Sequence, residues 1–368
     1  MISIQEVTTQ KELKQFIAYP KALYKNCPCY VPPLDADEYI TLIKHPAKAF
    51  CDVRLWMAYK NGKIAGRIGG VVNHRYNKLK NTRRIRFGWF DVDDDFETAQ
   101  ALLETVENWG REECLLEISG PSRYSNMEKQ GMLIEGFDVP TTISSEYNYP
   151  YYPLFMNDAG YEKEEDYLQM KVEIKEIPDN MKALSDRISE RYGIKTKEFK
   201  DKKEISGYAK SFFETLNDSF VDVYNFIPLT DSEIEYHIKN NFSRVDKDLI
   251  VMLADENDRI VGISLSVPSL TKAFQQANGR LFPWGWVPIL KALKKNDTLD
   301  LYLTGVLPQW FNRGIHALYH YQLHQNALKR GYKYAITTQQ TESSHSYRIW
   351  ERYGGKVISK RRCYVKRL

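Results

Sequence analysis

The segment with the clearest chemical pattern leads from an apolar strand into a helix. A predicted strand ends at Val306 and Leu307, a polar turn with Arg313 and Gly314 follows, and a helix starts after Ile315. Such a corner directs free backbone N–H groups and the positive end of the helix dipole at one point. Arg313 adds a charge-assisted contact. We predict an anion site suited to a pyrophosphate; an ordinary β-turn-α corner is the alternative.

Three histidines, His316, His320 and His324, recur every four residues on one face of that helix. Histidines with this spacing can share a metal ion. The helix supplies no carboxylate to complete such a site, so half-buried, hydrogen-bonded histidines are the favoured interpretation. The pair Cys27 and Cys29 lacks the spacing of a zinc knuckle, and no second cysteine pair follows it. No metal site is predicted.

An aromatic run, 281–295, precedes the strand that leads to this corner. Trp284 and Trp286 lie in its middle, and three lysines close it. The switch from aromatic to basic residues is typical of a segment that lies at a membrane surface. The same residues are suited to wall a tunnel for an acyl chain, which makes both tryptophans candidate substrate contacts. A packed lid over the core is the third interpretation.

The composition of the 368-residue chain, 43% hydrophobic and 27% charged, is that of a globular protein. A net charge of +4 gives no reason to expect a nucleic acid partner. No signal peptide and no apolar stretch of about 18 residues is seen. The five cysteines, an odd number, indicate free thiols in a reducing compartment. We expect a cytoplasmic protein, with peripheral contact at the inner membrane surface through 281–295.

Two passes of similar order can be read along the chain. Each contains helices, a hairpin of two strands, a further strand, a helix and closing strands. The turns 60–63 and 255–258 mark the hairpins, and the first carries Asn-Gly. The charged and polar connection 178–196 is the best boundary. We predict an α/β protein of two domains, 1–177 and 190–368, each with a mixed central sheet.

The first pass lacks a counterpart of the anion segment. Four carboxylates occur within 91–95 at the corresponding place, and they would repel a pyrophosphate. Their spacing lacks the Gly and the distal Glu of an EF-hand. A solvated turn with Asp95 as a helix N-cap is favoured instead. The first domain is therefore predicted to be a degenerate copy that binds no phosphate ligand.

Val306, Pro308 and Gly314 match a known loop pattern, roughly V-x-P-x-x-[QR]-x-x-G-x-[GA], which the chain leaves at Phe311 and His316. Further motifs are Leu23-Tyr24-Lys25, Tyr30-Val31-Pro32-Pro33-Leu34, Ala65-Gly66-Arg67-Ile68, Phe87-Gly88-Trp89-Phe90, Gly120-Pro121, Gly136-Phe137-Asp138, Tyr147-Asn148-Tyr149-Pro150, Phe226-Ile227-Pro228-Leu229-Thr230 and Asn278-Gly279-Arg280-Leu281-Phe282-Pro283. The loop resembles the coenzyme A loop of the GNAT acyltransferase superfamily. Nearly the whole chain resembles the YghO-like group of bacterial tandem GNAT proteins, which includes bacterial ceramide synthases.

This resemblance implies two GNAT folds in tandem and acyl transfer from a coenzyme A thioester to an amine. Acyl-CoA would be the co-substrate, and a long-chain, sphingoid-type or other amine the acceptor. The backbone of Val306 would pair with the pantetheine arm. Trp350 stands where a tyrosine is common, four residues before Gly354. The alternative is a non-catalytic protein of this fold that binds an acyl-thioester, a lipid or a protein partner.

Four more polar residues are candidates for this chemistry. Glu342 and His345 lie on the loop leaving the predicted strand 334–338, where acceptors bind in the GNAT fold. Amine acylation needs a base that keeps the nucleophile neutral, and a histidine titrates near neutral pH. Helix capping is the alternative role for both. Asn126 and Glu128 interrupt an apolar strand end and are expected to reach a cleft shared by the two domains.

Overall fold

The computed structural model describes residues 1–177, 179–240, 242, 245–344 and 346–368. The elements of the first half are β1 (Ile2–Glu6), α1 (Gln10–Leu23), α2 (Asp35–Lys44), η1 (Pro46–Ala49), β2 (Cys51–Lys60), β3 (Lys63–Asn73), α3 (His74–Lys80), β4 (Arg84–Val92), α4 (Phe96–Glu112), β5 (Glu117–Gly120), β6 (Met132–Glu135), α5 (Tyr151–Asp158) and β7 (Glu162–Glu173). Those of the second half are α6 (Asp179–Tyr192), β8 (Lys195–Thr196), α7 (Lys202–Gly207), α8 (Ala209–Ser219), α9 (Asp231–Asn240), β9 (Ile250–Ala254), β10 (Ile260–Pro268), α10 (Thr271–Ala277), α11 (Trp286–Lys294), β11 (Thr298–Val306), η3 (Pro308–Trp310), α12 (His316–Lys329), β12 (Tyr334–Thr337), β13 (Gln340–Thr341), α13 (Tyr347–Arg352) and β14 (Lys356–Arg367).

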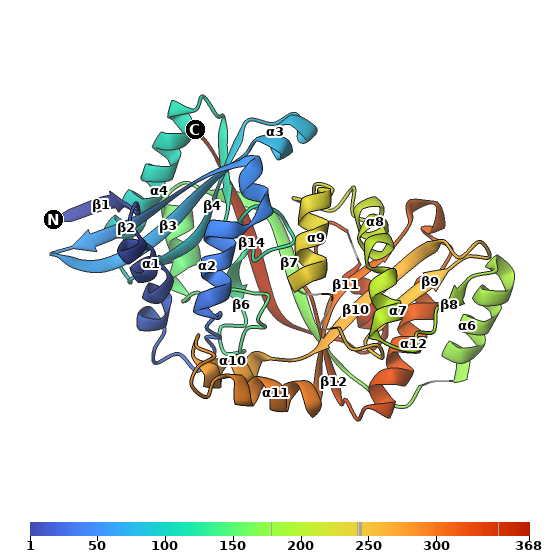
Figure 1. Ribbon diagram of the computed structural model, residues 1–368. Coiled ribbons are helices and arrows are strands. Elements are labelled where there is room, and N and C mark those ends of the chain that lie inside the picture. Colours follow the sequence, from blue (N-terminus) through green and yellow to red (C-terminus); the bar gives the residue numbers. More distant parts are fainter. Residues whose placement is uncertain (178, 241, 243–244, 345) are drawn as a thin grey trace.

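One mixed sheet runs through both halves of the molecule. Its strands lie in the order β1-β2-β3-β4-β5-β14-β7-β12-β11-β10-β9-β8, with β6 beside β14 and β13 beside β7. The pairs β4–β5 and β11–β12 are parallel. Figure 1 shows the first half, blue to green, on the left and most of the second half, yellow to red, on the right. The sheet is therefore the structural link between the halves.

The closing strands of the two halves are exchanged. β14, the last strand of the chain, pairs with β5 of the first half, and β7 pairs with β12 of the second. β14 and β7 also pair with each other, from Lys356 opposite Lys171 to Val365 opposite Glu162. In Figure 1 the red strand β14 passes between the halves. The predicted boundary near residue 178 therefore does not divide the sheet.

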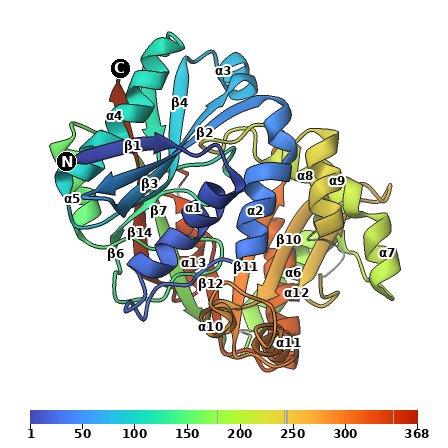
Figure 2. The same cartoon turned by 60° about the vertical axis from the view of Figure 1, so that its left-hand side comes forward.

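Helices cover both faces of each half. In the second half, α6 and α12 share one apolar core with the sheet, and α8 and α9 share another. In the first half, α4 covers one face, while α1 and α2 pack on the other. Figures 1 and 2 show these helices in front of and behind the strands. The result is a helix–sheet–helix arrangement whose strand ends and loops remain accessible for function.

Two hairpins form where their turn residues predicted them. β2 and β3 join through Asn61 and Gly62, whose φ angles of 52° and 77° suit a two-residue hairpin turn. β9 and β10 join through 255–258, with Asp258 at φ 62°. Asparagine, aspartate and glycine tolerate this left-handed region better than other residues. Helix α4 is amphipathic and buries its apolar face, formed by Ala99, Leu102, Leu103, Val106 and Trp109.

The segment 178–196, predicted as a charged connection, is instead largely helix. Its described part contains α6, and Ile188 of this helix is buried in the core shared with α12. Met181 and Ser185 are the other buried positions. These three residues form one stripe along α6, and the charged residues cover the opposite face. The segment therefore belongs to the packed second half, because a narrow apolar stripe is enough to dock a helix.

The turn 91–95 is not the fully solvated turn that was predicted. Asp91 is buried and lies 2.7 Å from a guanidinium nitrogen of Arg67. Asp95 occupies the N-cap position of α4, as predicted, but makes no side-chain capping bond to the helix. Its carboxylate instead lies 2.7 Å from Nζ of Lys60. Asp91 therefore contacts Arg67 instead of solvent, and Asp95 pairs with Lys60 instead of capping the helix.

Candidate functional site

The strand β11 separates from its parallel neighbour β12 partway along its length. The two strands pair from Thr298 opposite Tyr334 to Leu301 opposite Thr337, where β12 ends. The chain then pairs with β7 as β13, while β11 continues to Val306. In the described part of the chain, no strand covers this side of the end of β11. The splay leaves a backbone edge to which an extended ligand can bind by main-chain hydrogen bonds.

A β-bulge at Tyr302 marks the point of separation. Leu303 lies opposite Leu265 of β10, and Leu301 lies opposite Ser266, which leaves Tyr302 without a partner on that strand. A bulge bends its strand and increases the local twist. The bend therefore accounts for the direction in which the end of β11 leaves β12.

The segment after β11 presents N–H groups that the helix itself does not satisfy. Asn312 and Gly314 have left-handed φ angles of 60° and 76°, which turn the chain into the start of α12. Ile315 stands at the N-cap of α12 and makes no side-chain capping bond. The N–H groups of Ala317 and Leu318 donate to the carbonyls of Gly314 and Ile315. Those of Gly314, Ile315 and His316 have no backbone acceptor among the described residues, so they are available to an anion. The predicted corner at Leu307–Ile315 is thus formed.

Arg313 adds an uncompensated positive charge at this corner. Its guanidinium carbon lies 5.2 Å from the ring centre of Trp310 and 5.8 Å from that of Tyr192. Such cation–π contacts position a guanidinium without neutralising it. Among the residues that the structure describes, no carboxylate forms an ion pair with Arg313. Its charge is therefore available to a phosphate group.

Asp300 on β11 is a buried carboxylate that was not among the residues predicted from the sequence. It is 3% exposed, and neither carboxylate oxygen has a hydrogen-bond partner among the described residues. Burial raises the pKa of Asp300 to about 7, and the nearby Ser269 hydroxyl offsets part of that effect. A carboxyl group with this pKa can accept a proton near neutral pH. The available signal was a lone charge between Leu299 and Leu301 in an apolar strand.

Asp300 lies in the part of β11 that pairs with β12, and the anion corner follows the unpaired end of the same strand. A rise of about 3.3 Å per residue separates Asp300 from Val306 by about 20 Å along β11. The bulge lies between them. A ligand with an anionic head at the corner and a long extended arm would therefore bring its far end toward Asp300. This arrangement suits a bipartite ligand better than a compact anion.

Of the two predicted catalytic residues, only Glu342 lies within the described part of the chain. Glu342 follows β13, and its carboxylate lies 2.7 Å from Nζ of Lys163. The Glu342 backbone N–H donates to the carbonyl of Asp166 on β7. These contacts hold Glu342 on the β7 side of the splay, in a partly exposed ion pair. His345 lies outside the described residues.

Asn126 and Glu128 lie on a first-half loop that touches the second half. Glu128 Oε1 is 2.8 Å from Nε2 of His45. Burial lowers the pKa of His45, but the Glu128 carboxylate outweighs burial and raises the pKa overall. Oδ1 of Asn126 is buried without a partner among the described residues. Met127 packs against the same apolar cluster as Leu303 of β11, so this loop lies against the core of the second half.

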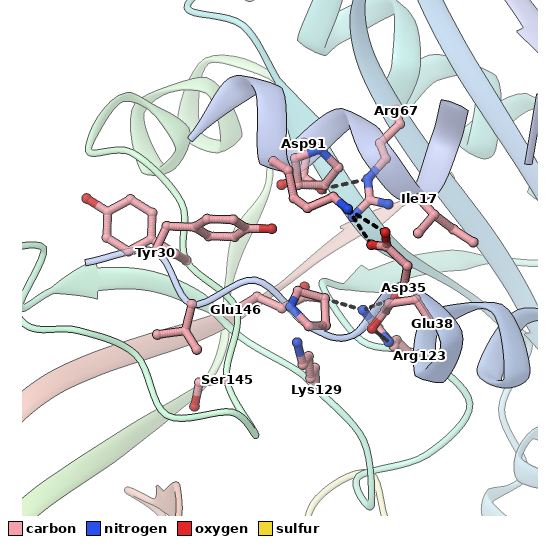
Figure 3. Close-up of a pocket in the computed structure, with 15 residues that line it drawn as sticks. Ile17, Tyr30, Asp35, Glu38, Arg67, Asp91, Arg123, Lys129, Ser145 and Glu146 are labelled. Carbon is pink, nitrogen blue, oxygen red and sulfur yellow. Dashed lines mark hydrogen bonds and ion pairs between the residues drawn. The ribbon is translucent and has the colours of Figure 1, made fainter. Parts of the chain in front are cut away.

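Figure 3 shows a pocket in the first half whose charged lining the sequence analysis did not identify. Arg123 donates two hydrogen bonds of 3.1 Å to Glu38, and Arg67 contacts Asp91 at 2.7 Å. Lys129 lines the same pocket, and burial lowers its pKa. The cavity volume is only 20 Å³, which is room for about one water molecule. These charges therefore act mainly on one another.

The histidines of α12 have separate surroundings. The ring of His320 packs against Trp350 and Tyr353, and burial lowers its pKa to about 3. His324 Nε2 lies 2.6 Å from the carbonyl oxygen of Lys175. Across the described ranges, no group of three histidine, cysteine or carboxylate side chains is arranged to hold a metal ion. The geometry fits the packed and hydrogen-bonded interpretation of these residues.

Trp284 and Trp286 are both exposed, so neither indole is packed in the core. They belong to the segment between β10 and β11 that contains α10 and α11. None of the helices that the structure describes has the length and apolar character needed to cross a membrane.

Comparison with known proteins places this geometry in context. No family model matches the chain. It is 28% identical to protein YghO of Escherichia coli over 304 residues. This aligned region covers 80% of this chain and 76% of YghO. It is 27% identical to the bacterial ceramide synthase of Caulobacter vibrioides over 300 residues. This aligned region covers 80% of this chain and 77% of that protein.

Solved structures of low sequence identity share the fold. A tandem GNAT protein from the clavulanic acid biosynthesis pathway superposes with a TM-score of 0.57 at 10% identity, over 100% of this chain and 98% of its own. A GCN5-related N-acetyltransferase from Sphaerobacter thermophilus gives 0.55 at 12% identity, over 100% of this chain and 95% of its own. The chain thus has the α/β GNAT fold with a mixed sheet, resembles the tandem GNAT proteins in structure, and is a homologue of YghO and of the bacterial ceramide synthase.

Proposed function

We propose that this protein is an N-acyltransferase that takes its acyl group from coenzyme A. The splay of β11 from β12, leading to the uncapped start of α12, is the observation that carries the proposal. The pyrophosphate would accept hydrogen bonds from Gly314 and Ile315 beside Arg313. The pantetheine arm would extend along Val306 and Leu307. The thioester would then lie near the bulge of β11.

Acyl transfer at this position needs a group that removes a proton from the amine. The nitrogen lone pair attacks the thioester carbonyl carbon, the C–S bond breaks, and coenzyme A leaves as a thiolate. We assign the proton from the amine nitrogen to Asp300, which can return it to the thiolate. Its burial and its pKa of about 7 support this role. The prediction that Glu342 and His345 take part in catalysis remains a proposal beside this assignment.

A long-chain amine is the acceptor class that we favour. One homologue is named a ceramide synthase, which suggests acylation of an amine. The exposed Trp284 and Trp286 are proposed contacts for the apolar chain of such a substrate. Asn126 and Glu128 are proposed to border the acceptor cleft, since Met127 of their loop packs against the same apolar cluster as Leu303 of β11.

We also propose that the chain contains two copies of the GNAT domain, 1–177 and 190–368, and that the first copy is degenerate. In the first copy β4 ends at Val92 and α4 begins at Phe96, with the carboxylates of 93–95 between them. Negative charge at this corner disfavours a pyrophosphate. The first copy would therefore act as scaffold and wall, and acyl-CoA would bind only to the second.

Coenzyme A binding tests the site directly by titration calorimetry with wild type, Gly314→Glu and Gly331→Glu. Both glycines have left-handed φ angles, 76° and 79°, so backbone strain is matched. A side chain at Gly331 would meet open space. The Gly314→Glu substitution would place charge and bulk against the pyrophosphate, so only that variant should lose binding. Equal affinity in all three proteins would contradict the proposed site.

Turnover separates the enzyme from the alternative, a GNAT-fold protein that binds an acyl-thioester, lipid or protein partner without reaction. Two observations favour this alternative. Glu342 is engaged in an ion pair with Lys163, and a tryptophan stands at position 350. A panel of acyl-CoA donors and long-chain amines, followed by thiol detection and mass spectrometry of the amide, decides between them. Coenzyme A binding without thiol release would identify the non-catalytic protein.

A further inference from the structure

The segment between β10 and β11 carries an exposed aromatic face. Phe282 is 80% exposed and Trp284 is 73% exposed, and Trp286, Leu290 and Leu293 are exposed as well. No residue of α11 is buried. Figures 1 and 2 both show α10 and α11 at the lower edge of the molecule, below the ends of the strands. Large apolar side chains gathered on one exposed face indicate an interaction surface.

This face is held in place by polar contacts between α10 and the first half. Gln275 Nε2 donates to the carbonyl of Pro28 at 2.7 Å. The hydroxyl of Thr271 donates to the carbonyl of Thr141 at 3.2 Å. The turn after α10 is fixed because the carbonyl of Gly279 accepts a 2.9 Å hydrogen bond from the backbone N–H of Asp35. The exposed residues are therefore presented by an anchored support.

The apolar residues of α11 form a stripe along the outer side of the helix. Trp286, Leu290 and Leu293 follow the spacing i, i+4 and i+7, which places them on one face. The indole N–H of Trp286 donates to the carbonyl of Pro283 at 2.9 Å. That indole can therefore enter an apolar phase without leaving its polar group unsatisfied. Phe282 and Trp284 lie just before the helix begins and are exposed as well.

Positive charge borders the stripe without any acidic residue in the segment. The segment 271–296 contains no aspartate or glutamate, and its five cations are Lys272, Arg280, Lys291, Lys294 and Lys295. None of them forms an ion pair within the described residues. The segment therefore has a net charge of +5, whereas the whole chain has a net charge of +4. An apolar stripe edged by unpaired cations complements an anionic lipid surface.

We propose that the face formed by Phe282, Trp284, Trp286, Leu290 and Leu293 docks on the surface of a bilayer that contains anionic lipid. The aromatic and leucine side chains enter the headgroup region, and the lysines contact lipid phosphates. The lipid surface is favoured over a protein partner because the segment combines an exposed apolar helix face with five cations and no carboxylate of its own. Docking requires no acyl-transfer activity.

The position of this face also deepens the proposed function, on which this step rests. The segment leaves the sheet at Pro268 and returns at Thr298, and Val267 lies directly opposite Asp300. The backbone N–H of Ser269 donates to the carbonyl of Thr298 at 2.9 Å, which closes the base of the segment. A lipid amine leaving the bilayer at this face would meet the sheet beside Asp300.

Vesicle flotation tests docking with phosphatidylcholine vesicles, with and without about one-third phosphatidylglycerol, at low and high salt. Wild type should float with the anionic vesicles at low salt and much less at high salt, because salt screens surface charge. The variant Trp284→Ala/Trp286→Ala should lower the partition coefficient at least about tenfold. The variant Lys291→Gln/Lys294→Gln/Lys295→Gln should lower it by about 10- to 100-fold at low salt.

Matched variants elsewhere control for general hydrophobicity and charge. Leu116→Ala/Leu154→Ala removes two exposed apolar side chains from another part of the surface. Lys11→Gln/Lys14→Gln/Lys25→Gln removes three exposed lysines. Both controls should bind vesicles as wild type does. Circular dichroism should show every variant folded, because α11 contributes no buried residue.

Several outcomes would overturn docking. Wild type that fails to float with anionic vesicles at low salt would do so, as would equal losses in the control variants. If light scattering shows a wild-type dimer that the tryptophan variant converts to a monomer, without vesicle binding, the face joins two copies of the chain instead. Coenzyme A titration on the same samples keeps failure of docking distinct from failure of the proposed enzyme.

Discussion

Asp300 illustrates how a single residue can oppose folding and serve chemistry. Its carboxyl has an ordinary pKa of 3.8 and a pKa of about 7 in the folded protein, because it is buried. The folded state therefore holds the proton more tightly than the unfolded state does. Ionisation of Asp300 weakens folding as the pH rises from about 4 to about 7. The raised pKa that allows Asp300 to accept a proton near neutral pH therefore also lowers the free energy of unfolding.

Replacing Asp300 with asparagine should separate these two effects. We expect kcat of Asp300→Asn to fall about 100- to 10,000-fold above pH 7, and its rise across neutral pH to disappear. The free energy of unfolding at pH 8 should increase by about 1–3 kcal/mol, since no buried charge remains. A pH–rate profile and urea unfolding at pH 6 and 8 check both. The control Asp297→Asn, at an exposed neighbour, should change neither.

Glu38 makes the opposite contribution. Burial opposes its ionisation, but the guanidinium of Arg123 outweighs burial and lowers the pKa of Glu38 to about 2. The depressed pKa contributes stability that is fully present above the ordinary value of 4.5 and is lost as the pH falls toward 2. The pocket of Figure 3 is thus a stabilising ion network at neutral pH.

Breaking that network should cost more than breaking a surface ion pair. Glu38→Gln is expected to lower the free energy of unfolding by about 2–4 kcal/mol at pH 7, because Arg123 keeps only Glu146 as an ion-pair partner among the described residues. Glu6→Gln, which breaks the exposed pair with Arg54, should cost less than about 1 kcal/mol. Denaturant unfolding at pH 7 measures both. If both variants lowered the free energy of unfolding by similar amounts, burial would not strengthen the contact between Glu38 and Arg123.

At the scale of single elements, α6 supports the anion corner from outside. Ile188 is buried in the core with α12, and a side chain added at Gly314 would lie 3.4 Å from Ile188. The helix therefore packs directly behind the turn that precedes α12. A segment that resembles a linker in composition thus holds the start of the helix that we assign to pyrophosphate binding.

Two substitutions on α6 distinguish packing from exposure. Ile188→Ala should destabilise the protein by about 2–4 kcal/mol and weaken coenzyme A binding, because it removes buried contacts behind the turn. Leu184→Ala, at an exposed position of the same helix, should stay within about 0.5 kcal/mol of wild type. Thermal unfolding and calorimetry provide the comparison. Equal effects at both positions would show that α6 does not pack as described.

At the scale of the whole molecule, the exchanged strands make the halves depend on each other. β14 completes the sheet beside β5, and β7 lies between β14 and β12. A fragment that ends at residue 177 lacks β14, and one that begins at 190 lacks β7. Each fragment would expose unpaired strand edges in the middle of a sheet, which favours aggregation.

We therefore expect neither fragment, 1–177 or 190–368, to fold alone. Co-expression should recover a folded complex, because each chain then supplies the strand that the other lacks. Hydrogen exchange should show β7 and β14 protected together in the intact protein. Independent, cooperative unfolding of both isolated fragments at the stability of the full chain would contradict this interdependence.

The features that the sequence determined are those with local causes. The Asn-Gly hairpin and the turn 307–315 depend on residues close together in the chain, so residue types and spacing sufficed to predict them. The exposed aromatic run at 281–295 was visible for the same reason. Motif resemblance added the GNAT fold, which the structural comparisons confirm.

Tertiary structure alone decided the rest, because burial and strand partners depend on segments far apart in sequence. Asp300 acquires its raised pKa only when β11 is covered, so its type gave no sign of a base. The ion network of Glu38 and Arg123 joins residues from α2 and a distant loop. The exchange of β7 and β14 is a choice among strand edges with similar backbone hydrogen-bonding groups, which side-chain patterns along a single strand do not specify.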